Sequence, residues 1–183
     1  LNSAKGLSYY GNGEFDVTLI NALGEWNNVD DIKILNFSNS FYKLLPQGGF
    51  IKSRISYSII FLLSMIPLYK FIKKNKPDYL IAHLITSLPI FLFTIFSFKT
   101  KLILRISGYP KLNFMRKFFW KFCSKNIHII TCPSDELKNQ LSKLNIFDKN
   151  KIVVLYDSVI SLKELNKQKK ITFKEDIKKT KYF

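Results

Sequence analysis

The sequence is poor in the residues that crosslink a chain or bind metals. It has 2 cysteines, Cys123 and Cys132, and 2 histidines among 183 residues. One pair of cysteines with no histidine at ligand spacing excludes a disulfide framework and a zinc site of ordinary spacing. We therefore expect two reduced, packed thiols in a cytoplasmic protein, and no metal.

Acidic residues are also scarce. Asp and Glu number 13 against 29 Lys and Arg, which gives a formal net charge of +16, and the only arginines are Arg54, Arg105 and Arg116. A compositionally biased genome would produce part of this lysine excess, but the charge still favours anionic partners such as a membrane surface or phosphates. No helix-turn-helix, zinc-finger or RNA-binding motif is visible, so we expect no nucleic-acid partner.

The short motifs of several enzyme classes are missing as well. We find no Ser–His–Asp order, metal-binding cluster or phosphate loop. Around Gly11-Asn12-Gly13, a dinucleotide fingerprint would need a third glycine where Asp16 stands, so that match is weak. No leader pattern follows Leu1, and we expect the chain to be cut from a longer protein.

Apolar residues, in contrast, are plentiful enough for the core of one domain, at 47% of the sequence. Three short apolar runs, 78–82, 102–104 and 127–130, each end on polar, Gly or Pro residues. Such runs are typical of strands in a parallel sheet that is covered on both faces, and ligands of these sheets bind at the carboxyl ends of the strands. The pattern predicts an α/β fold, a Rossmann-like parallel sheet with helices on both faces and a site at one edge.

Periodicity and capping residues predict the remaining elements. We expect loops over 1–13 and 38–50, strands over 31–37 and 152–156, and helices over 14–23, 51–75, 87–98, 114–124 and from 135 onward. Asn113 and Ser134 are the expected N-caps of the last two helices. Pro67 should kink the helix over 51–75.

Membrane insertion is the main alternative to this fold. Residues 79–98 carry no formal charge over a length close to the roughly 20 residues that cross a bilayer. Pro89 at the middle of this stretch and the polar residues His83 and Thr86 favour a strand, a polar corner and a helix instead. The alternative is a small integral membrane protein with helices near 55–74 and 79–98 and no catalysis.

The segment 114–124 interleaves aromatic and basic residues. They are Phe114, Phe118, Phe119, Trp120 and Phe122, with Arg116, Lys117, Lys121 and Lys125. One interpretation is a buried helix whose lysine stems lie along the apolar surface. The other is an interfacial helix that rests on anionic lipid.

Polar residues at the predicted strand ends form the candidate site. They are His83, Thr86, Ser87, Arg105, Ser107, Ser134 and Asp157. Three of them, and Gly108, have a structural alternative: a strand-end histidine is often only a hydrogen-bonded structural residue, and Arg105 can pair with Asp78 or Glu14 across the sheet edge. Ser134 can act solely as an N-cap, and Gly108 can serve only to shape a turn.

Four segments also stand in a characteristic order along the chain. They are PDYLIAH (77–83), LILRISGYP (102–110), ITCPSDELKNQL (130–141) and NKIVVLYDSVI (150–160). Together they resemble the amino-terminal domain of family-four glycosyltransferases of the GT-B fold, over most of residues 70–160. Each motif alone is unspecific, and the match depends on their order and spacing.

The resemblance implies a retaining glycosyltransferase, which moves a sugar from a nucleotide-sugar donor to a saccharide or lipid-linked acceptor. Such enzymes assemble bacterial surface polysaccharide and lipopolysaccharide, usually without a metal, and the nucleotide-sugar is a co-substrate rather than a cofactor. The first of two Rossmann-like domains binds the acceptor, and the second holds the donor. A cytoplasmic location is implied, peripheral on the inner face of the cytoplasmic membrane.

The resemblance also implies roles for single residues. His83 stands where the family has a strand-end histidine, and it is the candidate catalytic residue. The candidate substrate-binding residues are Gly11, Asn12, Gly13, Thr86, Arg105, Ser107, Gly108, Ser134 and Asp157. Many relatives carry histidine where Ser107 stands, so this position departs from the family pattern.

Two domains of unequal length are implied in the same way. Residues 1–160 correspond to the acceptor-side domain without its first strand, and residues 161–183 to a basic linker and the onset of the donor domain. The donor-binding Lys and paired Glu of that second domain have no counterpart in the chain. We expect the chain alone to be inactive.

Overall fold

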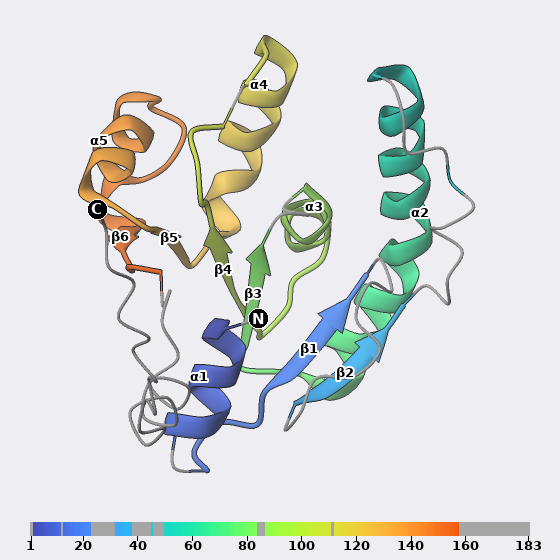
Figure 1. Cartoon of the computed structure of the whole chain (residues 1–183). Helices are drawn as coiled ribbons and strands as arrows, with labels where there is room; N and C mark the ends of the chain where they lie inside the picture. The colour runs from blue at the N-terminus through green and yellow to red at the C-terminus, as the bar shows by residue number, and fades with distance from the viewer. Residues whose placement is uncertain are drawn as a thin grey trace, which may run out of the picture.

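The computed structural model describes residues 2–11, 13–22, 32–37, 45, 50–83, 87–110 and 112–157. Figure 1 shows strands that lie side by side in the middle of the molecule, with helices packed around them. The predicted α/β class is confirmed.

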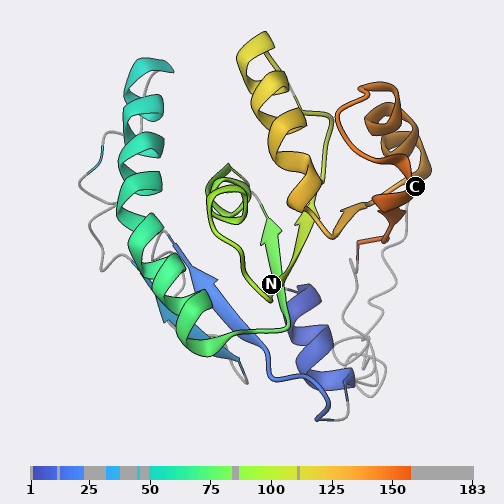
Figure 2. The ribbon, with the colours of Figure 1, turned by 180° about the vertical axis from the view of Figure 1, so that it is seen from behind.

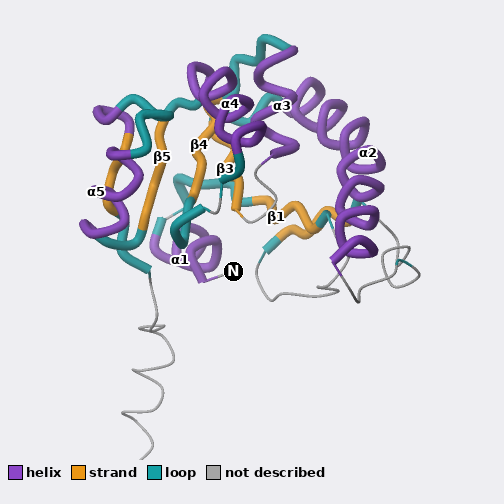
Figure 3. Tube along the Cα trace, turned by 90° about the horizontal axis from the view of Figure 1, so that it is seen from above, coloured by secondary structure: helices purple, strands orange, loops and turns teal. Residues whose placement is uncertain are grey.

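The main sheet is parallel throughout. It contains β3 Tyr79–His83, β4 Lys101–Arg105, β5 Ile129–Cys132 and β6 Ile152–Val154, and the order across the sheet is β3-β4-β5-β6. The helices that connect these strands are α3 Ser87–Ile95, α4 Phe114–Cys123 and α5 Asp135–Lys143 (Figure 3). Because every strand returns through a helix, the carboxyl ends of all four strands lie at the same edge of the sheet.

The predicted strands of this sheet are confirmed, and the bounds of β5 and β6 shift the most. β5 begins two residues later than the start of the expected 127–130 run, because the Ile127 amide closes the turn η2 Ser124–Asn126 by donating to the Ser124 carbonyl. The Ile127 side chain enters the core instead of facing a neighbouring strand. β6 is shorter than the expected 152–156 and is preceded by the turn η3 Lys149–Lys151.

The two faces of the main sheet are buried to different degrees. Side chains alternate between the faces along a strand. Leu102, Leu104 and Ile130 lie on the face that packs against the connecting helices and are almost completely buried. On the other face, Ile81 and Val153 are exposed. The main apolar core therefore lies between the sheet and the helices that connect its strands.

A second, two-stranded parallel sheet contains β1 Thr18–Asn21 and β2 Lys33–Asn36. β2 confirms the strand expected over 31–37, but β1 contradicts the helix expected over 14–23. The apolar positions of residues 14–23 fit a helical face and a short strand equally well, and β-branched Thr18 and Ile20 favour the strand. Pairing with β2 decides between the two, since it satisfies the backbone groups of both segments.

The first helix is also unexpected. Residues 1–13 were predicted to be a loop because of their Gly, Ser and Asn content, but Asn2–Tyr10 form the helix α1. Helix propensities differ by less than about 1 kcal/mol per residue, so a poor composition does not prevent a helix. The predicted loop over 38–50 lies largely outside the described residues, as does the predicted linker over 161–183.

The long helix α2 Phe50–Asn75 confirms the expectation for 51–75. Its buried residues Ser56, Ser64, Leu68 and Ile72 are spaced by multiples of four, so one face packs against the core. Figure 2 shows that α2 changes direction in its second half, which contains Pro67.

The structure of two segments, 79–98 and α2, can be compared with the alternative of two membrane-spanning helices. Residues 79–98 do not form one helix, because they divide between β3 and α3, as the strand–corner–helix interpretation predicts. In the part of the chain that the structure describes, one helix, Ile55–Asn75 within α2, is long and apolar enough to cross a bilayer. The core helix of a soluble protein can be equally long and apolar, so the length and composition of α2 are weak evidence for a membrane span.

Candidate functional site

The register of the main sheet places several polar side chains in one row at the carboxyl ends of the strands. His83 of β3 is aligned with Arg105 of β4, and Arg105 is aligned with Thr131 of β5. Residues aligned in this way point to the same face, which is the face opposite to Leu104 and its core contacts. Here the residues His83, Ser107, Arg105 and Asp157 are called the strand-end cluster.

His83 is held by a serine from the neighbouring strand end. Its Nε2 lies 2.9 Å from the Oγ of Ser107, which follows β4 by two residues. Partial burial lowers the pKa of His83 below its ordinary value, the positive charge of Arg105 lowers it further, and Asp157 opposes the shift. The neutral imidazole is therefore favoured, and a neutral imidazole has one nitrogen that can accept a proton.

Arg105 is buried, at 8% exposed, and its guanidinium forms an ion pair with Asp157. It also donates to the carbonyl of Leu155, at 3.3 Å and 3.4 Å. Arg105 therefore pairs with neither Asp78 nor Glu14, the alternative that the sequence left open, because the segment after β6 lies closer to the end of β4. Arg105 and Asp157 were both expected at the site, and their pairing joins the end of β4 to that segment.

Ser134 caps α5. Its Oγ accepts a hydrogen bond from the Leu137 amide at 3.2 Å, as the N-cap interpretation predicts. The thiol of Cys132 donates to the Ser134 and Val153 carbonyls, and burial raises the pKa of this thiol. Both cysteines are free and buried, as expected.

The three candidate glycines differ in how strongly their backbone position requires a residue without a side chain. Gly11 closes the end of α1, where its amide donates to the Leu7 carbonyl, and an added Cβ would lie 2.4 Å from that oxygen. Gly13 has a φ of +80°, a conformation that favours glycine. An added Cβ at Gly108 would meet nothing within 4 Å, so the fold does not require glycine there. Asn12 and Thr86 lie outside the described residues.

Some residues near the strand ends were not predicted as site residues. Thr131 is buried in the aligned row, and its carbonyl accepts from the Ile106 amide at 2.9 Å. The Tyr156 hydroxyl donates to a carboxylate oxygen of Asp135 at 3.2 Å, which links the segment after β6 to the start of α5. The predicted run ends at residue 130, whereas β5 extends to Cys132, so the sequence does not place Thr131 within the strand.

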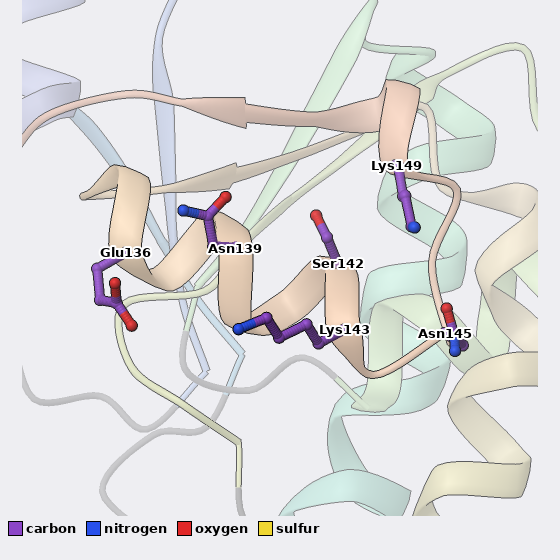
Figure 4. Close-up of a pocket in the computed structure, with 6 residues that line it drawn as sticks. All are labelled: Glu136, Asn139, Ser142, Lys143, Asn145 and Lys149. Carbon is purple, nitrogen blue, oxygen red and sulfur yellow. The ribbon is translucent and has the colours of Figure 1, made fainter.

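A pocket occurs elsewhere on the surface. It lies along α5 and the turns that follow, and Figure 4 shows its lining: Glu136, Asn139, Ser142, Lys143, Asn145 and Lys149. None of these residues belongs to the strand-end cluster, and the sequence predicted none of them as a site residue. Within the described ranges, no group of three or more His, Cys, Asp or Glu residues could hold a metal ion.

Comparisons with known families, with curated proteins and with solved structures find no match to this chain. The resemblance to glycosyltransferases therefore depends on the order of motifs in the sequence. The strand-end cluster places a neutral imidazole beside a hydroxyl, next to a paired guanidinium and carboxylate.

Proposed function

We propose that the chain is the acceptor-side part of a retaining glycosyltransferase. In this proposal a nucleotide-sugar donates the sugar, and a hydroxyl of a saccharide or of a lipid-linked saccharide accepts it. A second domain would hold the donor, as the resemblance implies, and the reaction would occur at the cytoplasmic face of a membrane in surface polysaccharide or lipopolysaccharide synthesis.

The supporting observation is the contact between His83 and Ser107 at the carboxyl ends of β3 and β4. Ligands of open parallel sheets bind at this edge. The two residues come from two of the four motifs that resemble the family, so the motifs meet in space as well as in sequence. Gly108 follows directly, and its exposed, unobstructed backbone leaves room for a ligand.

The proposed roles follow from these contacts. His83 would accept a hydrogen bond or a proton from the acceptor, a role that its lowered pKa favours near neutral pH. Ser107 would orient the imidazole, and Arg105 would position the segment after β6 through Asp157 and Leu155. Positive groups near the donor diphosphate and exclusion of water from the cleft would supply the remaining stabilisation.

Replacement of His83 by alanine tests the proposal. In the enzyme with both domains, we expect kcat/KM for sugar transfer to fall by much more than about threefold, which corresponds to about 0.7 kcal/mol. Transfer is measured with UDP-, GDP- and dTDP-sugars and with lipid-linked and free saccharide acceptors, by release of the nucleoside diphosphate.

His128→Ala is the matched control. His128 is exposed and immediately precedes β5, at the sheet edge opposite to the strand-end cluster. We expect this variant to keep its activity, and the melting temperature of both variants is measured to separate activity from stability. A kcat/KM that stays within about threefold for His83→Ala would make His83 a structural residue. Absence of transfer from every donor by the wild-type enzyme would contradict the proposed reaction class.

A further inference from the structure

The helix α4 is apolar on two opposite sides. On the inner side, Trp120 and Cys123 are buried in the core. On the outer side, four large apolar residues are exposed: Phe114 by 85%, Met115 by 79%, Phe118 by 70% and Phe122 by 65%. With roughly 3.6 residues per turn, positions 114, 118 and 122 follow one line along the helix and 115 lies beside it. These four side chains are called the outer stripe.

An outer stripe of this kind is unusual for a helix at a protein surface. A surface helix normally turns charged and polar residues outward and keeps its apolar residues toward the core. Grouped exposed apolar side chains indicate an interaction site, whereas single ones do not. The buried-helix interpretation of residues 114–124 therefore applies to the inner side alone.

Basic residues lie along the outer stripe. Lys117 and Lys121 are one turn apart beside it, Lys125 follows at the carboxyl end, and all three are exposed. The helix itself contains no Asp or Glu. Within α4 and at its carboxyl end, the charge next to the stripe is therefore positive, which complements an anionic surface.

Two features favour lipid over protein as the partner. Lysine is depleted in protein–protein interfaces, whereas lysines near a bilayer that contains anionic lipid add to its attraction. Interfacial helices combine aromatic residues on one side with lysine or arginine at the border of the apolar face. Figures 1 and 2 show that α4 extends beyond the main sheet at the edge of the molecule, where a flat surface can reach it.

We propose that the outer stripe of α4 docks the protein on an anionic bilayer. Phe114, Met115, Phe118 and Phe122 enter the boundary between headgroups and acyl chains, and the flanking lysines contact the anionic headgroups. The proposal is independent of sugar transfer, because its test measures lipid binding alone.

Vesicle co-sedimentation of the chain tests the proposal. Vesicles of phosphatidylcholine mixed with phosphatidylglycerol should bind the protein, vesicles of phosphatidylcholine alone should bind it at least about tenfold more weakly, and added salt should release it. Equal binding to both kinds of vesicle, or no binding to the anionic kind, would overturn the proposal.

Paired variants assign the binding to α4. Phe114→Ser with Phe118→Ser should weaken binding to anionic vesicles at least about tenfold, and Leu62→Ser with Leu63→Ser, at exposed positions of α2, should leave it unchanged. Lys117→Gln with Lys121→Gln should weaken it by a similar factor. Lys143→Gln with Lys149→Gln removes the same charge at the end of α5 and in the turn η3, and it should have little effect. The lysine variants change only exposed side chains, so they test the surface even where the serine variants lower stability.

A spin label at Met115→Cys gives the position of the stripe directly. In the vesicle-bound protein, this label should become accessible to oxygen and protected from a water-soluble relaxation agent, whereas a label at Lys143→Cys should stay in water. A label at position 115 that remains in water would overturn the proposal. So would loss of binding in the α2 variant but not in the α4 variants. A third outcome would also overturn the proposal: the chain associates with itself, does not bind lipid, and loses its self-association in the Phe114 and Phe118 variant. The partner of the stripe would then be a second copy of the chain.

Discussion

At the scale of single residues, the strand-end cluster shows how neighbouring groups set the state of a titratable side chain. His83 is exposed at the surface, but its neighbours partly desolvate the imidazole and Arg105 places a positive charge nearby, and both effects lower its pKa and disfavour the imidazolium. The Ser107 hydroxyl lies within hydrogen-bond distance of Nε2. A histidine in these surroundings is ready to accept a proton near neutral pH, which is the property that the proposed function uses.

The lowered pKa of His83 predicts how stability depends on pH. The unfolded chain takes up a proton as the pH falls through the ordinary value of 6.5, and the folded protein does so only at lower pH. Protonation therefore favours the unfolded state, and stability is lost as the pH drops below about 6.5. Between about pH 7.5 and pH 5.5, the melting temperature of the wild-type chain should fall more than that of His83→Asn. Equal falls would show that the pKa of His83 is the same in the folded and unfolded states.

The ion pair of Arg105 and Asp157 predicts that replacing Asp157 by alanine lowers the free energy of unfolding more than replacing Asp78 by alanine does. Asp157→Ala leaves a buried guanidinium with the Leu155 carbonyl as its remaining partner, and it should lower the free energy of unfolding by about 1–2 kcal/mol. Asp78→Ala, at an exposed acid that the sequence also offered as a partner, should change it by less than about 0.5 kcal/mol. Urea unfolding measures both, and equal losses would contradict the pairing.

At the scale of elements, the capping residues were predicted correctly from the sequence. Asn113 accepts from the Arg116 amide at the start of α4, and Ser134 accepts from the Leu137 amide at the start of α5. A cap is a local interaction among residues three positions apart, so the sequence alone contains all of its partners. The bounds of α4 and α5 follow from it.

Substitutions of Ser134 therefore test the contribution of the cap of α5 to stability. Ser134→Ala should lower the free energy of unfolding by about 1 kcal/mol, and Ser134→Asp, which keeps an oxygen acceptor, should preserve most of it. Ser142→Ala is the control, because the Ser142 hydroxyl donates to the Lys138 carbonyl within α5 and caps nothing. Thermal and urea unfolding give the comparison, and a similar loss for Ser134→Ala and Ser142→Ala would contradict the capping role.

β1 shows where local reasoning fails. The apolar positions of residues 14–23 fit a helix, yet residues 18–21 pair with β2. The partner strand, Lys33–Asn36, is distant in the sequence and has no local signature in the β1 sequence. Strand formation depends on such a partner, whereas a helix satisfies its own backbone, so short strands are the elements that sequence patterns mistake most easily.

At the scale of the whole molecule, the unequal burial of the two faces of the main sheet predicts unequal losses of stability on substitution. Leu104 is completely buried against the connecting helices, and Val153 on the other face is exposed. Leu104→Ala should lower the free energy of unfolding by about 2–5 kcal/mol through lost burial and the cavity it leaves. Val153→Ala should cost less than about 1 kcal/mol. Chemical denaturation measures both, and comparable losses would mean that the second face is covered in solution.

The sequence by itself determined the α/β class, the strands of the main sheet to within two residues, the caps of α4 and α5, and all four members of the strand-end cluster. These features depend on apolar runs, on capping pairs three residues apart and on the polar residues that follow each strand, all of which are local. Only the tertiary structure decided that Arg105 pairs with Asp157 rather than Asp78 or Glu14, that β1 is a strand, and that the stripe of Phe114 and Phe118 faces outward. Each of these depends on which distant segment lies alongside, and packing sets that arrangement for the whole chain at once.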